Sequence, residues 1–189
     1  MNIYFDTEFT GLHKDTSLIS IGLLSDCGKM FYAELNDYDK SKVDSWIQKN
    51  VINKLLSHDS MGPNLPDWYR YSDKQSIRHD LNEWLDSFDD DIITFVSDVA
   101  HYDFVLLIDL LWGNALDMPE KYSPIVHDIN NDIAEYFNIS KREAFNYSRE
   151  KIIQHSSNNA PTGLGEDKHN ALYDARVIRY IYNIINKYR

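Results

Sequence analysis

The sequence predicts an α/β protein whose mixed five-stranded sheet is flanked by helices. Two observations predict this fold class. Two apolar segments near the start are separated by only four residues, and the later apolar segments alternate with segments of helical periodicity. The chain has 189 residues, of which 43% are hydrophobic and 26% charged, so it suits one domain of the usual ~100–200 residues. We therefore expect residues 1–189 to form a single domain.

Five segments have the apolar, β-branched composition of strands: residues 2–6, 18–24, 29–35, 91–97 and 124–129. The second and third are joined by Ser25-Asp-Cys-Gly28, which is turn chemistry, so we expect them to form a hairpin. The fifth leads into a helix that we expect to continue through Phe137.

Four further segments place apolar residues three and four apart, as one face of a helix requires: residues 41–56, 72–88, 102–112 and 168–188. Ser72 is in position to cap the second of them. Trp46, Trp84 and Trp112 fall on apolar positions, and we expect them in the core. The run Trp68-Tyr-Arg-Tyr71 is expected to be a loop with aromatic rings around a cation.

Composition excludes several classes of protein. The single cysteine, Cys27, rules out an intrachain disulfide framework and a zinc ribbon. No apolar run approaches the ~18 residues of a membrane span, and a carboxylate at position six is unlike a signal peptide. We therefore expect a cytoplasmic protein. The formal net charge of −11 argues against binding nucleic acid by charge alone, although divalent cations among clustered carboxylates would reverse the local sign.

The first candidate site is the pair Asp6 and Glu8 on the first strand. Residues two apart on a strand point to the same face, so both carboxylates can reach one cation. The alternative is a solvated strand end, which such a pair taken alone would favour.

The second candidate is His169 with Asp174, at the start of the last helix. The same spacing occurs at His127 and Asp132, so spacing cannot choose between them. Ala171 and Ala175 flank Asp174 and allow the helix to approach the sheet closely, whereas His127 lies within an apolar strand pattern that is typical of a buried histidine. We therefore favour His169 and Asp174.

The third candidate is Asp103, which follows the strand at 91–97 and falls in the first turn of a helix. A carboxylate is favoured there by the helix dipole, which is also the explanation that needs no chemistry. Asp98 and Asp109 are rivals, but Asp98 follows the strand too early and Asp109 lies further along the helix.

The order of these motifs resembles that of the DEDDh 3'-5' exonucleases, and Phe5-Asp-Thr-Glu-Phe-Thr-Gly-Leu12 matches their first motif. Further stretches resemble the polyadenylate-specific exoribonuclease group, ribonuclease AS: residues 18–22, 31–33, 45–47, 77–81, 100–103, 111–113 and 169–175. The segment 123–166 fits that group poorly and is longer than expected, and Ser17 stands where the group tends to carry Glu.

The resemblance implies a ribonuclease H-like fold and a two-metal phosphodiester hydrolysis. Asp6, Glu8, Asp103 and Asp174 would hold two Mg²⁺ or Mn²⁺ ions, and His169 would take the proton of the attacking water. The implied substrate is single-stranded RNA degraded from its 3' end, with poly(A) as the candidate preference. A homodimer is also implied.

We expect the substrate to contact Thr7, Phe9, Leu12 and Tyr102, with Phe9 and Leu12 bracing the terminal nucleotide. The alternative for Phe9 is a place in the core. Three other functions remain open on sequence grounds: a proofreading-type exodeoxyribonuclease with the same residues, an inert nucleic-acid-binding module, and a protein-interaction scaffold. The intact acids and His169 argue against the last two.

Overall fold

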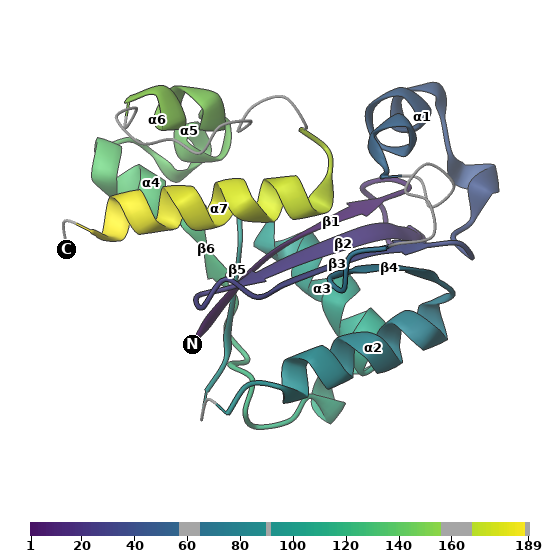
Figure 1. The fold of residues 1–189 in the computed structure, drawn as a ribbon. Coiled ribbons are helices and arrows are strands. Elements are labelled where there is room, and N and C mark those ends of the chain that lie inside the picture. Colours follow the sequence, from purple (N-terminus) through teal and green to yellow (C-terminus); the bar gives the residue numbers. More distant parts are fainter. Residues whose placement is uncertain (57–64, 90–91, 156–167, 188–189) are drawn as a thin grey trace.

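A computed structural model describes residues 1–56, 65–89, 92–155 and 168–187, and it contains one six-stranded sheet (Figure 1). The strands are β1 (Asn2–Phe9), β2 (Leu18–Ser25), β3 (Met30–Leu35), β4 (Tyr69–Ser72), β5 (Thr94–Ser97) and β6 (His127–Asp128), in the order β4-β3-β2-β1-β5-β6. The first three strands run antiparallel to one another, while β4, β5 and β6 each run parallel to the neighbour on their inner side. The two central strands are therefore β2 and β1, and β1 carries Asp6 and Glu8.

The expected number of five strands is wrong, because residues 69–72 form β4 instead of a loop. Tyr69 pairs with Tyr32 and is buried, so an aromatic ring that a loop would have exposed packs against the sheet. The strand expected at 124–129 shortens to two residues, and Ile125 before it is exposed. The strand expected at 91–97 is β5, and Asp91 lies outside the described residues.

The helices of the described residues are α1 (Ser45–Asn50), α2 (Lys74–Asp86), α3 (Ala100–Leu111), α4 (Ile129–Phe137), α5 (Lys141–Phe145), α6 (Arg149–His155) and α7 (Ala171–Asn186). The helix expected at 41–56 is three pieces, with 3-10 turns on either side of α1. Asp73, and not Ser72, caps α2 by accepting from the backbone of Ser76. No helix among these is long and apolar enough to cross a membrane.

The sheet lies between two helical layers. Helices α2 and α3 cover one face, where Ile77, Leu81 and Leu107 pack against Phe5 and Leu23 of the sheet. Helix α7 covers the other face together with α4, and their isoleucines pack against Tyr4 and Val96. Trp84 and Trp112 pack at the edge of the first of these cores.

Helix α7 begins in direct contact with the sheet. A Cβ atom added to Gly22 of β2 would lie 2.3 Å from the backbone nitrogen of Leu172, so only glycine permits this approach. Ala171 is fully buried at the same contact. The close approach predicted from Ala171 and Ala175 therefore occurs, and it places the first turn of α7 beside β1 and β2.

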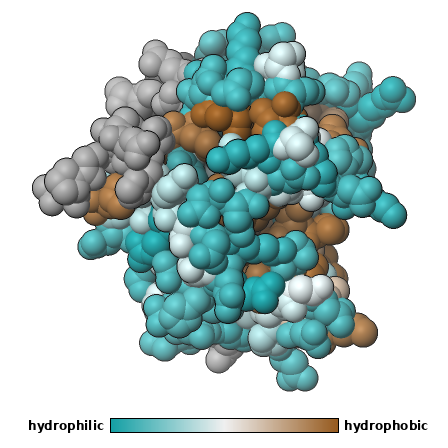
Figure 2. Space-filling model, turned by 90° about the vertical axis from the view of Figure 1, so that its right-hand side faces the viewer, coloured by the Kyte–Doolittle hydropathy of each residue, from teal (hydrophilic) through white to brown (hydrophobic). Residues whose placement is uncertain are grey.

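Figure 2 shows the side of the molecule that lies to the right in Figure 1. Hydrophobic residues form separate areas there, within a surface that is largely hydrophilic.

Candidate active site

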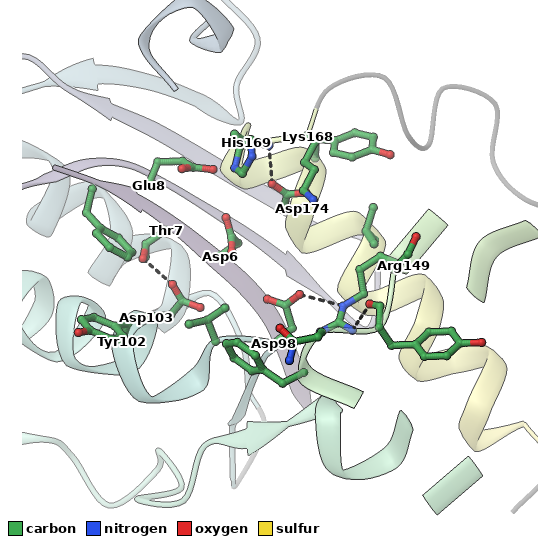
Figure 3. Close-up of a pocket in the computed structure, with 18 of the residues that line it drawn as sticks. Asp6, Thr7, Glu8, Asp98, Tyr102, Asp103, Arg149, Lys168, His169 and Asp174 are labelled. Atoms are coloured by element: carbon green, nitrogen blue, oxygen red, sulfur yellow. Dashed lines mark hydrogen bonds and ion pairs between the residues drawn. The ribbon is translucent and has the colours of Figure 1, made fainter. Parts of the chain in front are cut away.

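Four acids from three elements meet in one cavity of about 640 Å³ (Figure 3). Asp6 and Glu8 project from β1, Asp103 comes from α3, and Asp174 comes from the first turn of α7. Asp6 and Glu8 lie on the same face of the strand, as the alternation of a strand requires, and both are buried. The structure thus brings the four acids together, although they are far apart in the sequence.

Asp103 is held by two hydroxyl groups. The hydroxyl of Thr7 donates to its Oδ1 at 2.6 Å, and the hydroxyl of Ser97, at the end of β5, donates to its Oδ2. The residue is 1% exposed and lies in the first turn of α3. The hydroxyl of Thr7 is therefore already used in a hydrogen bond to Asp103.

His169 lies where the chain enters α7. Its backbone N–H donates to Oδ2 of Asp174 at 2.8 Å, and its φ of 69° lies in the left-handed region that side chains other than glycine rarely adopt. Asn170 then caps the helix by accepting from the backbone of Tyr173. Asp174 thus fixes the backbone of His169, and the two residues share one end of the cavity.

Potential ligand atoms form two groups in the cavity. One oxygen of Asp6, Asp98 and Asp103 lies within 4.8 Å of the others, and the same holds for the ligand atoms of Glu8, His169 and Asp174. Asp98 had been set aside as a rival of Asp103, yet it lines the cavity as well. Its place directly after Ser97, at the carboxyl end of a parallel strand, is the signal that could have identified it.

Asp98 forms an ion pair that links the cavity to the segment 123–166. Nε of Arg149, at the start of α6, lies 3.2 Å from Oδ2 of Asp98, and Nη2 of Arg149 donates to Asn130 of α4. The Nη1 group donates to the carbonyl oxygens of Ala144 and Tyr147. Described residues of this segment, between Phe145 and Ile153, therefore line the cavity, which sequence analysis missed.

The pair His127 and Asp132 is formed elsewhere. Nε2 of His127 bonds to Oδ2 of Asp132, which is buried in α4, and the imidazole ring meets Tyr182 of α7 edge-on. Neither residue is among the described residues that line the cavity. The pair joins β6 to α4, as expected for a histidine that stabilises the fold.

The pKa values of all four carboxyl groups are raised. Burial, and then the charges of Asp103 and Asp174, raise the pKa of Asp6 well above its usual range. Burial followed by the charges of Asp174 and Asp103 raises the pKa of Glu8 to about 9. Burial likewise raises the pKa of Asp103 and of Asp174 to about 7. Positive charge in the cavity would relieve this repulsion.

The residues fit a divalent cation. Oδ2 of Asp6 is buried and, among the described residues, has no hydrogen-bond partner. A buried carboxylate oxygen without a partner is costly, and coordination to a cation satisfies it. Carboxylate oxygens, in turn, are the ligands that Mg²⁺ and Mn²⁺ prefer. Asp6, Glu8, Asp103 and Asp174 therefore suit such ions.

His169 is suited to accept a proton. Burial, and then the positive charges of Lys168 and Lys54, lower the pKa of its imidazole from its usual value. These effects favour the neutral ring. Because it lies beside Glu8 and Asp174, a proton that it accepts stays next to the carboxylates.

Phe9, Leu12 and Tyr102 lie together at the rim of the cavity. The rings of Phe9 and Tyr102 stack at 5.8 Å, and the hydroxyl of Tyr102 donates to the backbone oxygen of Leu12. Phe9 also packs on the core at its edge, so both of its expected roles have a structural basis. The side chain of Leu12 is 69% exposed and free to meet a ligand.

Trp46 corrects an expectation. It was expected in the core, but it is 54% exposed, and its ring meets the ring of His169 edge-on at 5.2 Å. Because α1 is only six residues long, its apolar face is filled by Ile47, and Trp46 is left to border the cavity. The apolar spacing that predicted burial of Trp46 runs over residues 41–56, whereas α1 covers only Ser45–Asn50.

Comparisons with known proteins match this chain to one family and to solved structures. A family described as the 3'-5' exoribonuclease Rv2179c-like domain matches residues 1–185. The chain is 32% identical over 119 residues to the 3'-5' exoribonucleases Rv2179c and MT2234.1 of two strains of Mycobacterium tuberculosis. That match spans 63% of this chain and 66% of each relative, slightly less than two thirds of their length.

Two solved structures share the fold. The nuclease domain of 3'hExo, a DEDDh family member bound to rAMP, matches with a TM-score of 0.63 at 9% identity, over 98% of this chain and 91% of that one. A chain from the structure of the yeast NOT1 MIF4G domain co-crystallised with CAF1 matches with a TM-score of 0.51 at 18% identity, over 97% of this chain and 79% of that one. The first likeness confirms the ribonuclease H-like α/β fold class expected from the motifs.

Proposed function

Because this chain belongs to the 3'-5' exoribonuclease Rv2179c-like family, we propose that it hydrolyses single-stranded RNA from the 3' end with the help of divalent cations. The observation that carries the proposal is the unpartnered, buried Oδ2 of Asp6 among acids whose ionisation burial opposes, next to a neutral imidazole. A cavity of this kind is stable in its ionised form only with cations, and a phosphodiester supplies the anion that such cations attract. We assign this activity to residues 1–189 as one domain.

Asp6, Glu8, Asp103 and Asp174 would hold two Mg²⁺ or Mn²⁺ ions. When bound, such ions increase the acidity of water and stabilise the negative charge on the leaving oxygen. Thr7 and Ser97 keep the carboxylate of Asp103 oriented through their two hydrogen bonds. Asp174 has two roles, because the carboxylate that would hold an ion also accepts a hydrogen bond from the backbone N–H of His169.

His169 acts as the general base. Its neutral imidazole takes a proton from water as the water oxygen attacks phosphorus, and the bond from phosphorus to the 3' oxygen of the preceding nucleotide breaks. The leaving oxygen takes up a proton from solvent, which yields a nucleoside 5'-monophosphate and an RNA shortened by one nucleotide. The proton on His169 then passes to solvent through the open cavity.

The terminal nucleotide would lie between the rim and α1. The exposed side chain of Leu12 and the stacked rings of Phe9 and Tyr102 offer an apolar surface for a base, and stacking on such rings contributes ~1–3 kcal/mol per base. Thr7 would contact the substrate only through its backbone, since its hydroxyl is bound to Asp103. A preference for poly(A) and a homodimer complete the proposal; light scattering on the purified protein tests the dimer.

The experiment is degradation of end-labelled poly(A), poly(U) and single-stranded DNA with Mg²⁺ or Mn²⁺, with Asp6→Asn prepared in parallel as a control for contaminating nucleases. We expect release of nucleoside 5'-monophosphates from RNA, none in excess EDTA, and none from the variant. Cleavage of DNA with RNA left intact would instead favour the proofreading-type exodeoxyribonuclease. Cleavage that persists in excess chelator would overturn the proposal.

A further inference from the structure

A buried polar network lies behind His169, on the side away from the cavity. At its centre is Glu34 of β3, which is 2% exposed. Its Oε1 accepts from the hydroxyl of Tyr32 at 2.8 Å and from the backbone N–H of Leu56 at 2.6 Å, and its Oε2 accepts from the hydroxyl of Tyr69 at 3.0 Å. A buried carboxylate with three donors on it is fixed in one orientation.

The network continues into the start of α7. Burial, and then the neighbouring charge of Glu34, raise the pKa of Tyr32, so its hydroxyl keeps its proton and donates it to Glu34. The oxygen of that hydroxyl is then an acceptor, and Nδ2 of Asn170 donates to it at 3.2 Å. The same Nδ2 also donates to the backbone oxygen of Lys54 at 3.3 Å.

Asn170 is thereby bound through both ends of its amide. Its oxygen caps α7 by accepting from Tyr173, and its nitrogen is used by Tyr32 and Lys54. The preceding residue is His169, whose left-handed backbone requires outside support to persist. Asp174 provides one support from the cavity side, and Asn170 provides the other from the interior.

We propose that the contact between Tyr32 and Asn170, anchored on Glu34, positions His169 for proton transfer. This inference rests on the proposed function. None of the described residues that line the cavity is Tyr32, Glu34 or Asn170. These three are therefore positioning residues, and they touch neither RNA nor water in the cavity. The same network also connects residues 54–56 to the segment that carries His169. Residues 54–56 follow α1, the helix that carries Trp46.

Two substitutions cut the contact, and a third is the matched control. Tyr32→Phe removes the acceptor of Asn170, and Asn170→Ser removes the donor while it keeps an oxygen for the helix cap. Tyr69→Phe also removes a buried hydroxyl from Glu34, but on its other oxygen, so the contact with Asn170 remains. We expect similar losses of Tm for the two tyrosine variants.

Turnover should distinguish the two variants that cut the contact from the control variant. We expect kcat to fall about 10- to 100-fold in Tyr32→Phe and Asn170→Ser, because a misplacement of ~1 Å is enough for that loss, while KM and Mn²⁺ affinity stay unchanged. Tyr69→Phe should keep kcat within about twofold. In a His169→Ala background, Tyr32→Phe should cause no further loss, since residues that act through one group are not additive. An equal loss in that background would overturn the inference.

A measurement without RNA keeps the test independent of the proposed function. Amide exchange at His169, followed by NMR, should be at least about tenfold faster in Tyr32→Phe than in wild type or Tyr69→Phe. Unchanged exchange in Tyr32→Phe would contradict the inference even if the protein is an active exoribonuclease. If the wild type degrades no RNA, the proposed function fails, and the exchange rates alone decide whether Tyr32 supports His169.

Discussion

Asp6 is a buried carboxylate in a cavity that it shares with other acids. It is buried on a central strand, its Oδ2 has no partner among the described residues, and three other carboxylates of the candidate site share its cavity. Burial of a polar atom without a partner is rare in folded proteins and points to function. At the scale of single residues, each acid of the candidate site therefore works against the stability of the metal-free fold and for the binding of cations.

The first prediction concerns the four acids. Asp6→Asn, Glu8→Gln, Asp103→Asn and Asp174→Asn should each abolish detectable cleavage and weaken Mn²⁺ binding at least about 100-fold, since mutation of even an outer partner of a metal ligand costs 10–100-fold. Asp6→Asn should also raise the Tm of the metal-free protein by about 2–4 °C or more, because it removes a like charge. Calorimetry and thermal melts measure both effects. Normal turnover in one variant would remove that residue from the site.

The second prediction compares His169 with His127. His169→Ala should lower single-turnover kcat by roughly 10²–10⁴-fold with little change in Mn²⁺ affinity. His127→Ala should keep turnover but cost about 1–3 kcal/mol of unfolding free energy, because it leaves Asp132 buried without its imidazole. Because burial lowers the pKa of His169, the wild-type rate should fall at a lower pH than an ordinary histidine base would give. An inactive His127→Ala with an active His169→Ala would show that the last motif was misread.

At the scale of elements, the candidate site is made by β1, the start of α3 and the start of α7, and all three could be predicted. Alternation along β1 placed Asp6 and Glu8 on one face, and the small residues around Asp174 predicted a helix close to the sheet. Three features could not be predicted, because each depends on a tertiary contact. Tyr69 becomes a strand residue only beside Tyr32, and Trp46 is exposed because α1 ends early. Arg149 acts only once α6 packs beside Asp98.

The third prediction tests the contact of α7 with β2. Gly22→Ala should lower the unfolding free energy by about 1–3 kcal/mol, because the new Cβ atom meets the backbone of Leu172. It should also reduce turnover, since α7 carries Asp174 and follows His169. Gly28→Ala separates backbone strain from a steric clash: its φ is +90°, but nothing lies within 4 Å of an added Cβ, so it should cost stability without reducing turnover. Chemical denaturation and turnover of both variants provide the comparison, and a fully active, fully stable Gly22→Ala would refute the close packing.

At the scale of the whole molecule, charge and pH are linked through the cavity. A carboxylate whose pKa is higher in the folded state binds more protons there than in the unfolded chain. The stability that it contributes is complete below its unfolded pKa and is lost as the pH rises through its folded pKa. For Asp103 and Asp174 that window extends from about pH 4 to about 7, and for Glu8 it extends to about 9.

The fourth prediction follows from that sign. In EDTA, the Tm should fall as the pH rises from 5 to 8, and saturating Mn²⁺ should restore most of the loss at pH 8, because the ions bind only the folded state. A Glu8→Gln variant should show a shallower fall in EDTA, whereas Asp117→Asn, at an exposed aspartate, should follow the wild type. Differential scanning calorimetry across this range measures the slopes. A Tm in EDTA that rises with pH would contradict the assigned shifts.

The order of the site along the chain has a consequence during synthesis. Asp6 and Glu8 leave the ribosome early, but the base and the fourth acid lie in the last described helix and the residue pair before it. A nascent chain that has been made only as far as α6 therefore has three of the four acids and no base. On the proposed function, β1 cannot complete the site until α7 has been made, so a partly made chain would not cut the messenger at its own ribosome.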